Sequence, residues 1–260
     1  MKTVFASVIS NREVMPGVHL IWLESPQIAS VAQPGQFVMV HCGEGTEYML
    51  RRPLSIHQIS DNEKLVLLFA VMGKGTYWLS QCQAGDTLDL LGPLGNSYSI
   101  HPTTHNLLLI AGGIGTAPLC FLSQEALKRG LSVTLLLGAQ TSNQLYPGNF
   151  LPSGINLVAA TEDGTAGRKG MVTYLIPDFI DWTDQAFACG PVTMYQDMYT
   201  RRKELLKSKS VQVSLEVRMG CGLGACYSCT VKTRGGLRQV CKDGPVFDLE
   251  EILWNEPTCV

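Results

Sequence analysis

The first half of the chain alternates short apolar segments with Gly and Pro, and this pattern predicts a β-rich domain. Gln36–His41, Leu54–Ile59 and Leu65–Met72 are typical of the apolar segments, and pairs such as Pro34-Gly35 separate them. Many short strands at even spacing are typical of a sandwich or a small barrel. We expect one helix, beginning near Thr76, to interrupt these strands.

After residue 101 the pattern changes to longer apolar runs that alternate with helix-like stretches. Asn106–Ala111 is a continuous apolar run, which predicts a strand covered on both faces. Thr116–Arg129 then predicts a helix, and Ser132–Leu137 a second buried strand. The same criteria predict strands at Asn156–Ala160, Gln185–Cys189 and Val211–Val217 and a helix at Met194–Lys207. Such alternation is typical of a parallel sheet with crossover helices.

Four of the nine cysteines crowd into the tail with the spacing Cys221-x4-Cys226-x2-Cys229-x11-Cys241. The intervals of four and then two residues match the plant-type ferredoxin run, whose cluster takes four thiolates. The intervening glycines allow a tight loop with backbone N–H groups aimed at the sulfurs. The spacing therefore predicts an iron–sulfur site. The early return of the fourth cysteine predicts a small appended lobe rather than a complete ferredoxin domain.

Zinc and a redox disulfide are the alternatives for this tail. Structural zinc usually takes two separated Cys-x2-Cys pairs, and the tail holds one. Disulfides are rare in a reducing compartment. The remaining cysteines are scattered, and we expect them to be small buried apolar residues: Cys42, Cys82, Cys120, Cys189 and Cys259.

Two features of the β-rich half suggest phosphate binding. Arg51-Arg52-Pro53-Leu54-Ser55 puts a guanidinium and a hydroxyl on one strand, where they can reach a phosphate and a flavin ring edge. Gly73-Lys74-Gly75-Thr76 opens the expected helix, whose free N–H groups form an anion site. Each feature alone is equally explained by a strand start or a capped turn. Together, and in this order, they favour a dinucleotide flavin.

Two glycine turns follow buried strands in the second half of the chain. Gly112-Gly113-Ile114-Gly115-Thr116 joins a strand to a helix, as at the pyrophosphate site of an open α/β sheet. Cys189-Gly190-Pro191 ends another strand at the same sheet edge. Such turns often have only a structural role, and Gly-x-Gly-x-x-Gly is absent. Two of them on one edge nevertheless favour a nucleotide cleft.

The charges near this cleft favour NADH over NADPH. A 2′-phosphate requires Arg or Lys, and no such residue occurs between Leu131 and Gly167. Glu162 and Asp163 in that stretch are acidic. The sequence therefore predicts a nicotinamide cofactor without a 2′-phosphate, which is NADH rather than NADPH.

The whole-chain composition indicates a globular protein of 260 residues, with 45% apolar and 16% charged residues. Its net charge of −2 argues against nucleic acid and anionic membranes as partners. No apolar run approaches the roughly 20 residues that span a bilayer. We therefore expect a cytoplasmic protein.

In their order along the chain, these motifs and Gly92–Gly95 (Gly-Pro-Leu-Gly) resemble the ferredoxin-NADP reductase superfamily. With the cysteine tail added, the chain is similar to the electron-transfer subunits of class 1B, NAD-dependent dihydroorotate dehydrogenase. The resemblance implies a β-barrel plus α/β fold. It places an FAD-binding antiparallel β-barrel at 1–101, a parallel-sheet NAD-binding domain at 102–215 and a [2Fe-2S] lobe at 216–260.

The resemblance also implies which residues bind each group. FAD contacts would come from Arg52, Pro53, Leu54, Ser55, Phe69, Ala70, Val71, Gly75 and Thr76. NAD(H) contacts would come from Gly112, Gly113, Gly115, Thr116, Cys189, Gly190 and Pro191. Cys221, Cys226, Cys229 and Cys241 would hold the cluster. Two positions depart from the family pattern, because Ala70 stands where Arg is expected and Leu54 where Tyr is common. No protein acid or base is expected for the hydride step.

By the same resemblance, the partner is an FMN-containing dihydroorotate dehydrogenase catalytic subunit in a 2+2 heterotetramer. Electrons would pass from that FMN through the [2Fe-2S] cluster and FAD to NAD+, in pyrimidine biosynthesis. One alternative is an NADH-linked subunit of another complex, of the sulfide dehydrogenase, ferredoxin reductase or hydrogenase type. An alternative of a different class is a zinc-binding redox-sensing or structural protein.

Overall fold

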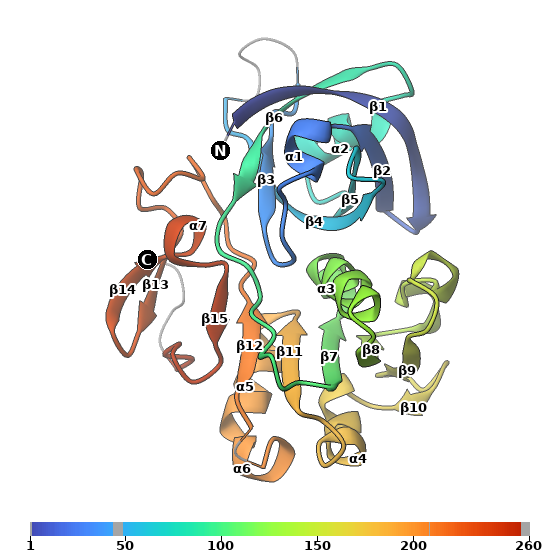
Figure 1. Cartoon of the computed structure of the whole chain (residues 1–260), viewed down its shortest axis with the longest axis vertical. Helices are drawn as coiled ribbons and strands as arrows, with labels where there is room; N and C mark the ends of the chain where they lie inside the picture. Colours follow the sequence, from blue (N-terminus) through green and yellow to red (C-terminus); the bar gives the residue numbers. More distant parts are fainter. Residues whose placement is uncertain (1, 44–48, 208, 256–260) are drawn as a thin grey trace.

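The computed structural model describes residues 2–43, 49–207 and 209–255, which form a barrel, a parallel sheet and a C-terminal lobe (Figure 1). The last five residues of the expected lobe, 256–260, which include Cys259, therefore lie outside the described residues. Six antiparallel strands close the barrel in the order β1-β2-β5-β4-β3-β6. They are β1 (Lys2–Met15), β2 (Val18–Glu24), β3 (Phe37–Val40), β4 (Arg52–Ser60), β5 (Lys64–Ala70) and β6 (Thr87–Leu94).

Strand alternation explains how the barrel acquires a core. In β1 the buried residues Val4, Ala6 and Val8 alternate with exposed neighbours, as expected when one face of a strand is solvated. Two short helices, α1 (Pro26–Ala29) and α2 (Lys74–Gln81), accompany the strands. The expected helix near Thr76 is thus confirmed, with its start at Lys74.

The second half forms a seven-stranded sheet in the order β10-β9-β8-β7-β11-β12-β15. Its neighbours pair in parallel, except that β15 runs antiparallel to β12. The strands are β7 (Asn106–Gly112), β8 (Ser132–Ala139), β9 (Asn156–Thr161), β10 (Arg168–Lys169), β11 (Gln185–Cys189), β12 (Val211–Ser214) and β15 (Val246–Asp248). The predicted parallel sheet is confirmed. Leu107–Ala111 is completely buried, as its unbroken apolar run requires.

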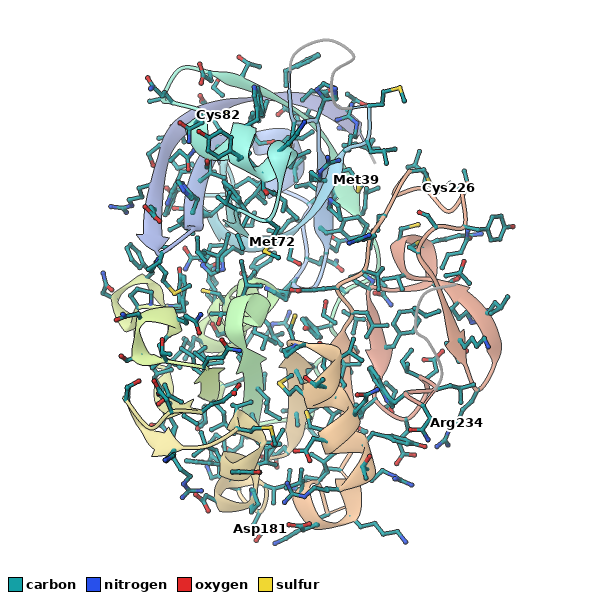
Figure 2. The ribbon with its side chains drawn as sticks, turned by 180° about the vertical axis from the view of Figure 1, so that it is seen from behind. Met39, Met72, Cys82, Asp181, Cys226 and Arg234 are labelled. Atoms are coloured by element: carbon teal, nitrogen blue, oxygen red, sulfur yellow. The ribbon has the colours of Figure 1, made fainter. Side chains whose placement is uncertain are left out.

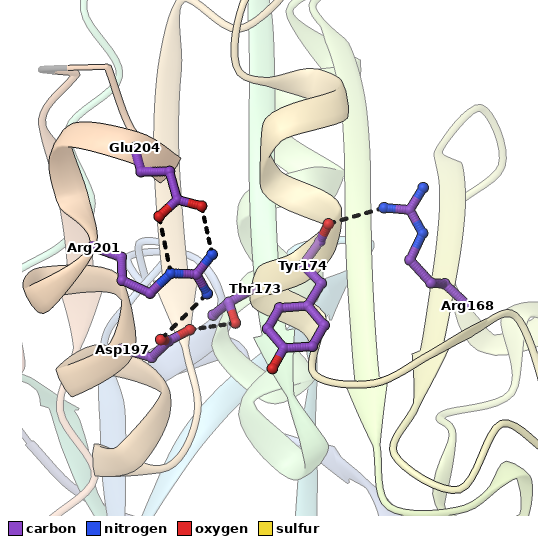
Figure 3. Close-up of polar contacts among 6 residues, drawn as sticks. All are labelled: Arg168, Thr173, Tyr174, Asp197, Arg201 and Glu204. Atoms are coloured by element: carbon purple, nitrogen blue, oxygen red, sulfur yellow. Dashed lines mark hydrogen bonds and ion pairs between the residues drawn. The ribbon is translucent and has the colours of Figure 1, made fainter.

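Helical segments cover the sheet. They are α3 (Thr116–Lys128), α4 (Ile176–Phe179), α5 (Val192–Thr200), α6 (Arg202–Leu205) and the 3₁₀ turns η1 (Gly113–Gly115), η2 (Ser142–Gln144), η3 (Gly148–Phe150) and η4 (Val172–Leu175). The single helix expected over Met194–Lys207 is wrong, because the chain leaves helical geometry at Arg201 (φ −98°, ψ 17°). Figure 3 shows a polar cluster around this break. Arg201 pairs with Glu204 at 2.7 Å and with Asp197 at 3.5 Å, and Asp197 accepts a 2.5 Å hydrogen bond from Thr173 of η4.

Helix α3 lies between the barrel and the sheet and joins them (Figure 1). At a bulge in β4, between Ile56 and Gln58, the buried His57 ring points out of the barrel. Its Nδ1 lies 3.1 Å from the Ala117 carbonyl oxygen of α3, and its Nε2 lies 2.9 Å from the Tyr146 hydroxyl. The polar interior of this interface therefore fixes one orientation of the two domains.

The C-terminal lobe contains β13 (Thr230–Thr233), β14 (Gly236–Gln239) and α7 (Val240–Asp243). Its chain then returns as β15 to the edge of the large sheet, and the Trp254 ring packs at 5.0 Å from Tyr195 of α5. Asn96, just after the barrel, also holds the lobe through hydrogen bonds of 2.8 and 2.9 Å to the Val246 backbone. The lobe is thus attached to both other parts. The domain boundaries at 101/102 and 215/216 stay predictions.

No helix in the described ranges is both long and apolar enough to cross a bilayer.

The buried His57 predicts how stability should depend on pH. Burial lowers the pKa of His57 from 6.5 to about 4, so the folded state stays neutral where the unfolded chain takes up a proton. This residue's contribution is therefore complete above the unfolded pKa and is lost as pH falls toward the folded one. Between about pH 7 and pH 4.5 the loss should be about 2–3 kcal/mol.

Urea unfolding of the wild type and of His57→Gln at these two pH values measures the effect. Glutamine cannot take up the proton, so the variant's free energy of unfolding should fall by about 2–3 kcal/mol less than that of the wild type. Equal losses in both proteins would show that the acid sensitivity arises elsewhere.

Candidate functional site

The cysteine loop between β12 and β13 directs backbone N–H groups at sulfur atoms. Leu223 and Ala225 each donate to Cys221 Sγ at 3.3 Å, and Gly224 donates to Cys241 Sγ at 3.1 Å. Cys241 N–H donates to Cys229 Sγ at 3.4 Å. Gly222 (φ +71°) and Gly224 (φ +80°) adopt the left-handed geometry that lets the loop turn so tightly. Such N–H donors stabilise thiolates and tune the potential of a bound cluster.

The four cysteines interact in two pairs, Cys221 with Cys226 and Cys229 with Cys241. The Ser228 hydroxyl, 3.2 Å away, and then Cys221 lower the pKa of the Cys226 thiol to about 6. Burial and then the neighbouring Cys229 raise the pKa of Cys241 to about 12. Two pairs of thiolates fit the two irons of a [2Fe-2S] cluster. Within the part of the chain that the structure describes, no three His, Cys, Asp or Glu side chains are grouped to hold a single metal ion.

On the barrel, the first residue of β4 meets the start of α2. A Cβ atom on Gly75 would stand 2.8 Å from Arg52 Nε, so only glycine lets the guanidinium lie this close to the helix. Thr76 Oγ1 accepts hydrogen bonds from the N–H groups of Met72 (2.9 Å) and Gly73 (3.2 Å), which fixes the turn. A guanidinium beside a helix N-terminus is chemically suited to a diphosphate. Arg51 is directed elsewhere, because it pairs with Asp89 at 2.6 Å.

The other residues predicted to contact the flavin lie on different faces of the barrel wall. Pro53 and Ser55 stand opposite Met39 and Phe37 of β3, whose side chains point outward, whereas Leu54 packs on the barrel core. The Phe69 side chain is buried in that core and stacks on His19 at 5.5 Å between ring centroids. Phe69 can therefore offer only its backbone to a ligand outside the barrel. Ala70 and Val71, at the strand end, are half-buried.

A cleft of about 490 Å³ separates the barrel from the carboxyl edge of the sheet. Its walls bring together residues that are far apart in the sequence. Five of the residues predicted to bind a cofactor line this cleft: Ala70, Gly112, Gly113, Gly190 and Pro191. The exposed Met72 lies in the same region between barrel and sheet (Figure 2). Brought together in this way, the two glycine turns form one surface, as the sequence predicts.

Close backbone approach explains why these turns need glycine. A Cβ atom on Gly115 would stand 2.0 Å from the Cys189 carbonyl oxygen, and one on Gly112 would stand 2.7 Å from Pro191 Cδ. Gly113, with φ +55°, has no atom within 4 Å of its Cβ position and leaves that side open. Thr116, in contrast, is buried, and its hydroxyl donates to the Gly113 carbonyl at 3.2 Å. The Thr116 side chain thus shapes the turn.

Glu216 is a cleft residue that the sequence analysis did not select. The buried Cys189 Sγ lies 3.6 Å from Glu216 Oε1, and burial raises the pKa of the Cys189 thiol. The Glu216 side chain lines the cleft and is exposed there. A carboxylate two residues after the end of β12 was the available signal, because strand ends at this edge meet ligands. Tyr195 supports the same floor, since its hydroxyl accepts from Gly190 N–H (2.9 Å) and donates to Ser214 O (2.7 Å).

The two acidic residues that favoured NADH have different positions. Glu162 lines the cleft together with Gln140 and Asn143. Asp163 instead accepts hydrogen bonds from the backbone N–H and the hydroxyl of Thr165 at 2.9 and 2.7 Å, and these lower the pKa of its carboxyl. Of the two, Glu162 alone faces the place where a nucleotide would lie.

Comparison with known proteins identifies the relatives of this chain. Residues 216–253 match the family model described as the iron–sulfur cluster binding domain of dihydroorotate dehydrogenase B. The electron transfer subunit of dihydroorotate dehydrogenase B (NAD(+)) from Desulforamulus reducens is 41% identical, over 98% of this chain and 100% of that protein. The corresponding subunit from Bacillus pumilus is 37% identical, over 97% of this chain and 98% of that protein.

Two solved structures have the same fold. The NADH-dependent reduced ferredoxin-NADP oxidoreductase has a TM-score of 0.85 at 30% identity and covers 98% of this chain and 91% of its own. A ferredoxin NADP+ reductase from Neisseria gonorrhoeae, solved with FAD and NADP, has a TM-score of 0.64 at 18% identity, over 79% of this chain and 92% of its own. The barrel and sheet are thus those of the ferredoxin reductases, and the full-length similarity identifies this chain as a member of the family of dihydroorotate dehydrogenase B electron transfer subunits.

Proposed function

We propose that the chain takes electrons from a partner that oxidises dihydroorotate and passes them to NAD+, in the pyrimidine pathway. One observation carries the proposal. The cysteine loop packs on β3 of the barrel, the adjacent strand β4 bears the residues expected to bind flavin, and the nucleotide cleft opens between the barrel and the sheet. The proposed cluster, flavin and nicotinamide sites would therefore adjoin one another in space, in that order, within one chain.

Each site fits its group by the chemistry of its residues. Cys221, Cys226, Cys229 and Cys241 would hold the [2Fe-2S] cluster. Arg52 and the start of α2 would bind the FAD diphosphate, and Ser55 would face the flavin. The two glycine turns would bind NAD(H). When bound, a flavin exchanges electron pairs with nicotinamide and single electrons with a cluster, which supplies the conversion this route needs.

The partner would approach the exposed side of the cysteine loop. Cys226 is exposed there, and the neighbouring side chains of Tyr227 and Leu223 are 69% and 46% exposed. Tyr227 also holds φ at +60°, an uncommon geometry for a bulky residue and a frequent mark of function. We assign this face to an FMN-containing catalytic subunit, in a 2+2 heterotetramer in the cytoplasm.

A second candidate is an NADH-dependent reductase of ferredoxin. The structure of the NADH-dependent reduced ferredoxin-NADP oxidoreductase favours it, because the similarity covers 98% of this chain at 30% identity. The same three sites would serve either role. The identity of the partner separates the two candidates, so the test must vary the partner.

The test is anaerobic and uses the purified, cofactor-loaded chain with a dihydroorotate dehydrogenase B catalytic subunit. Dihydroorotate-dependent reduction of NAD+ should require both chains. With ferredoxin in place of the catalytic subunit, reduction of ferredoxin by NADH should be absent. Reduction of ferredoxin by NADH, together with no activity with the catalytic subunit, would establish the second candidate. A preparation that holds zinc and has no visible absorbance would contradict both.

Replacement of an exposed cluster cysteine should separate the two halves of the route. In Cys226→Ser, the NADH-dependent bleaching of the flavin should continue at the wild-type rate, because the nicotinamide cleft is unchanged. Partner-dependent turnover should fall by about 10² or more, since the loss of a metal ligand disrupts the site. Stopped-flow absorbance and the coupled assay measure the two rates.

Cys82→Ser is the matched control, since Cys82 is buried in the barrel and its thiol donates to the Trp78 carbonyl, as a serine can. This variant should keep both rates. Wild-type partner turnover in Cys226→Ser would refute the route through the cluster.

Glu162 should set the preference for NADH. A carboxylate in the cleft repels a 2′-phosphate, so Glu162→Gln should raise kcat/KM for NADPH about tenfold and change the value for NADH by less. Asp163→Asn is the control, because Asp163 is engaged with Thr165. An unchanged NADPH/NADH ratio in Glu162→Gln would show that the cofactor ribose binds elsewhere.

A further inference from the structure

The face of β3 toward the cysteine loop carries a methionine that the proposed route does not explain. Val38 and Val40 point into the barrel core, whereas Phe37 and Met39 point outward. The outward residues belong to the same buried apolar cluster as Cys229 and Cys241. Met39 has no exposed surface, although it lies on the outer wall of the barrel. The C-terminal lobe must therefore be what covers it.

The contact between Met39 and the cysteine loop is made at Gly222, directly after Cys221. A Cβ atom on Gly222 would stand 2.6 Å from Met39 Cγ and 3.1 Å from Met39 Sδ. Leu94 Cδ1 of β6 lies 3.3 Å from the same point. The Gly222 backbone therefore rests on the methionine side chain with no room for a substituent. Figure 2 shows Met39 on its strand beside the loop that carries Cys226.

The other side of Met39 adjoins the strand expected to bind flavin. In the β3–β4 register Met39 stands directly opposite Pro53, and Phe37 stands opposite Ser55. Side chains directly opposite each other in an antiparallel pair lie about 5 Å apart on the same face. Met39 is thus one strand away from Pro53 and in contact with the loop that holds Cys221.

We propose that Met39 is a positioning residue that holds the cysteine loop at a fixed separation from the flavin-binding strand. A thioether side chain is suited to this place, because it is flexible enough to fill an irregular gap and polarisable enough to pack closely. The rate of electron transfer falls as the two redox groups move apart, so the elements that carry them need support that fixes their separation. The inference rests on the proposed function, since it gives Met39 a role between the two redox groups of that route.

The test truncates Met39 in steps in the loaded protein, with Met39→Leu, Met39→Val and Met39→Ala. After anaerobic mixing with NADH, stopped-flow absorbance separates flavin reduction from the later reduction of the cluster. Flavin reduction should stay within about twofold of the wild type in all three variants. The rate of cluster reduction should fall in the order Leu, Val, Ala, by roughly tenfold at alanine, because each truncation removes support that places the loop beside the flavin-binding strand.

A second measurement does not depend on turnover. Hydrogen–deuterium exchange at the amides of 222–225 should become faster in Met39→Ala, because the loop has lost its support. Met198→Ala is the matched control, since Met198 of α5 is equally buried in the same apolar cluster but is not among the side chains nearest to Gly222. This control removes the same atoms and should leave both the cluster rate and the exchange of the loop unchanged.

The possible outcomes are distinct. Wild-type cluster reduction in Met39→Ala, or an equal slowing in Met198→Ala, would overturn the role of Met39 while the proposed function stands. If Met39→Ala fails to load its cluster, the Leu and Val variants decide, and the absence of a graded decrease between them overturns the inference. A wild-type protein that binds neither flavin nor cluster would instead contradict the proposed function itself.

Discussion

The packing of α3 between the barrel and the parallel sheet is the interaction on which the site depends. Neither domain alone contains the cleft, because one wall comes from the barrel ends and the other from the carboxyl edge of the sheet. The interface is polar inside, with His57 hydrogen-bonded to Ala117 and Tyr146. Gln124 of α3 adds two hydrogen bonds to the Ile59 backbone, at 2.8 and 3.2 Å. Directional contacts of this kind select one relative orientation, which an apolar surface would define less sharply.

The C-terminal lobe is likewise held in place by contacts with other parts of the chain. It is too small to bury a sufficient core of its own. Its strand β15 pairs with the edge of the large sheet, and its Trp254 ring packs against Tyr195. Asn96, just after the last barrel strand, is hydrogen-bonded to the lobe at Val246. These contacts fix the position of the cysteine loop relative to both domains. For an electron-transfer protein this is useful, since the loop itself is rich in glycine and has little internal packing.

The cleft floor shows how much chemistry the fold concentrates at strand ends. Cys189 ends β11, Glu216 follows β12, and the Gly112 turn ends β7. Parallel strands bring their carboxyl ends to one edge, so residues separated by about a hundred positions become neighbours. Glycine at Gly115 then lets the first turn press on the Cys189 carbonyl. The result is a surface of backbone and small groups that suits a flat ring system.

The sequence by itself determined the fold class and the chemistry of the tail. Apolar runs gave most strands to within a few residues, because burial on one or both faces is visible in a local pattern. Cysteine spacing identified the cluster motif for the same reason, since its ligands are close in the chain. Tertiary structure alone decided that Phe69 faces the barrel core, that the helix after Pro191 breaks at Arg201 and that β15 joins the sheet. It also selected Glu162 over Asp163, revealed Glu216 and placed Met39 beneath Gly222. These facts depend on contacts between residues distant in sequence, and no local pattern of hydrophobicity or spacing encodes them.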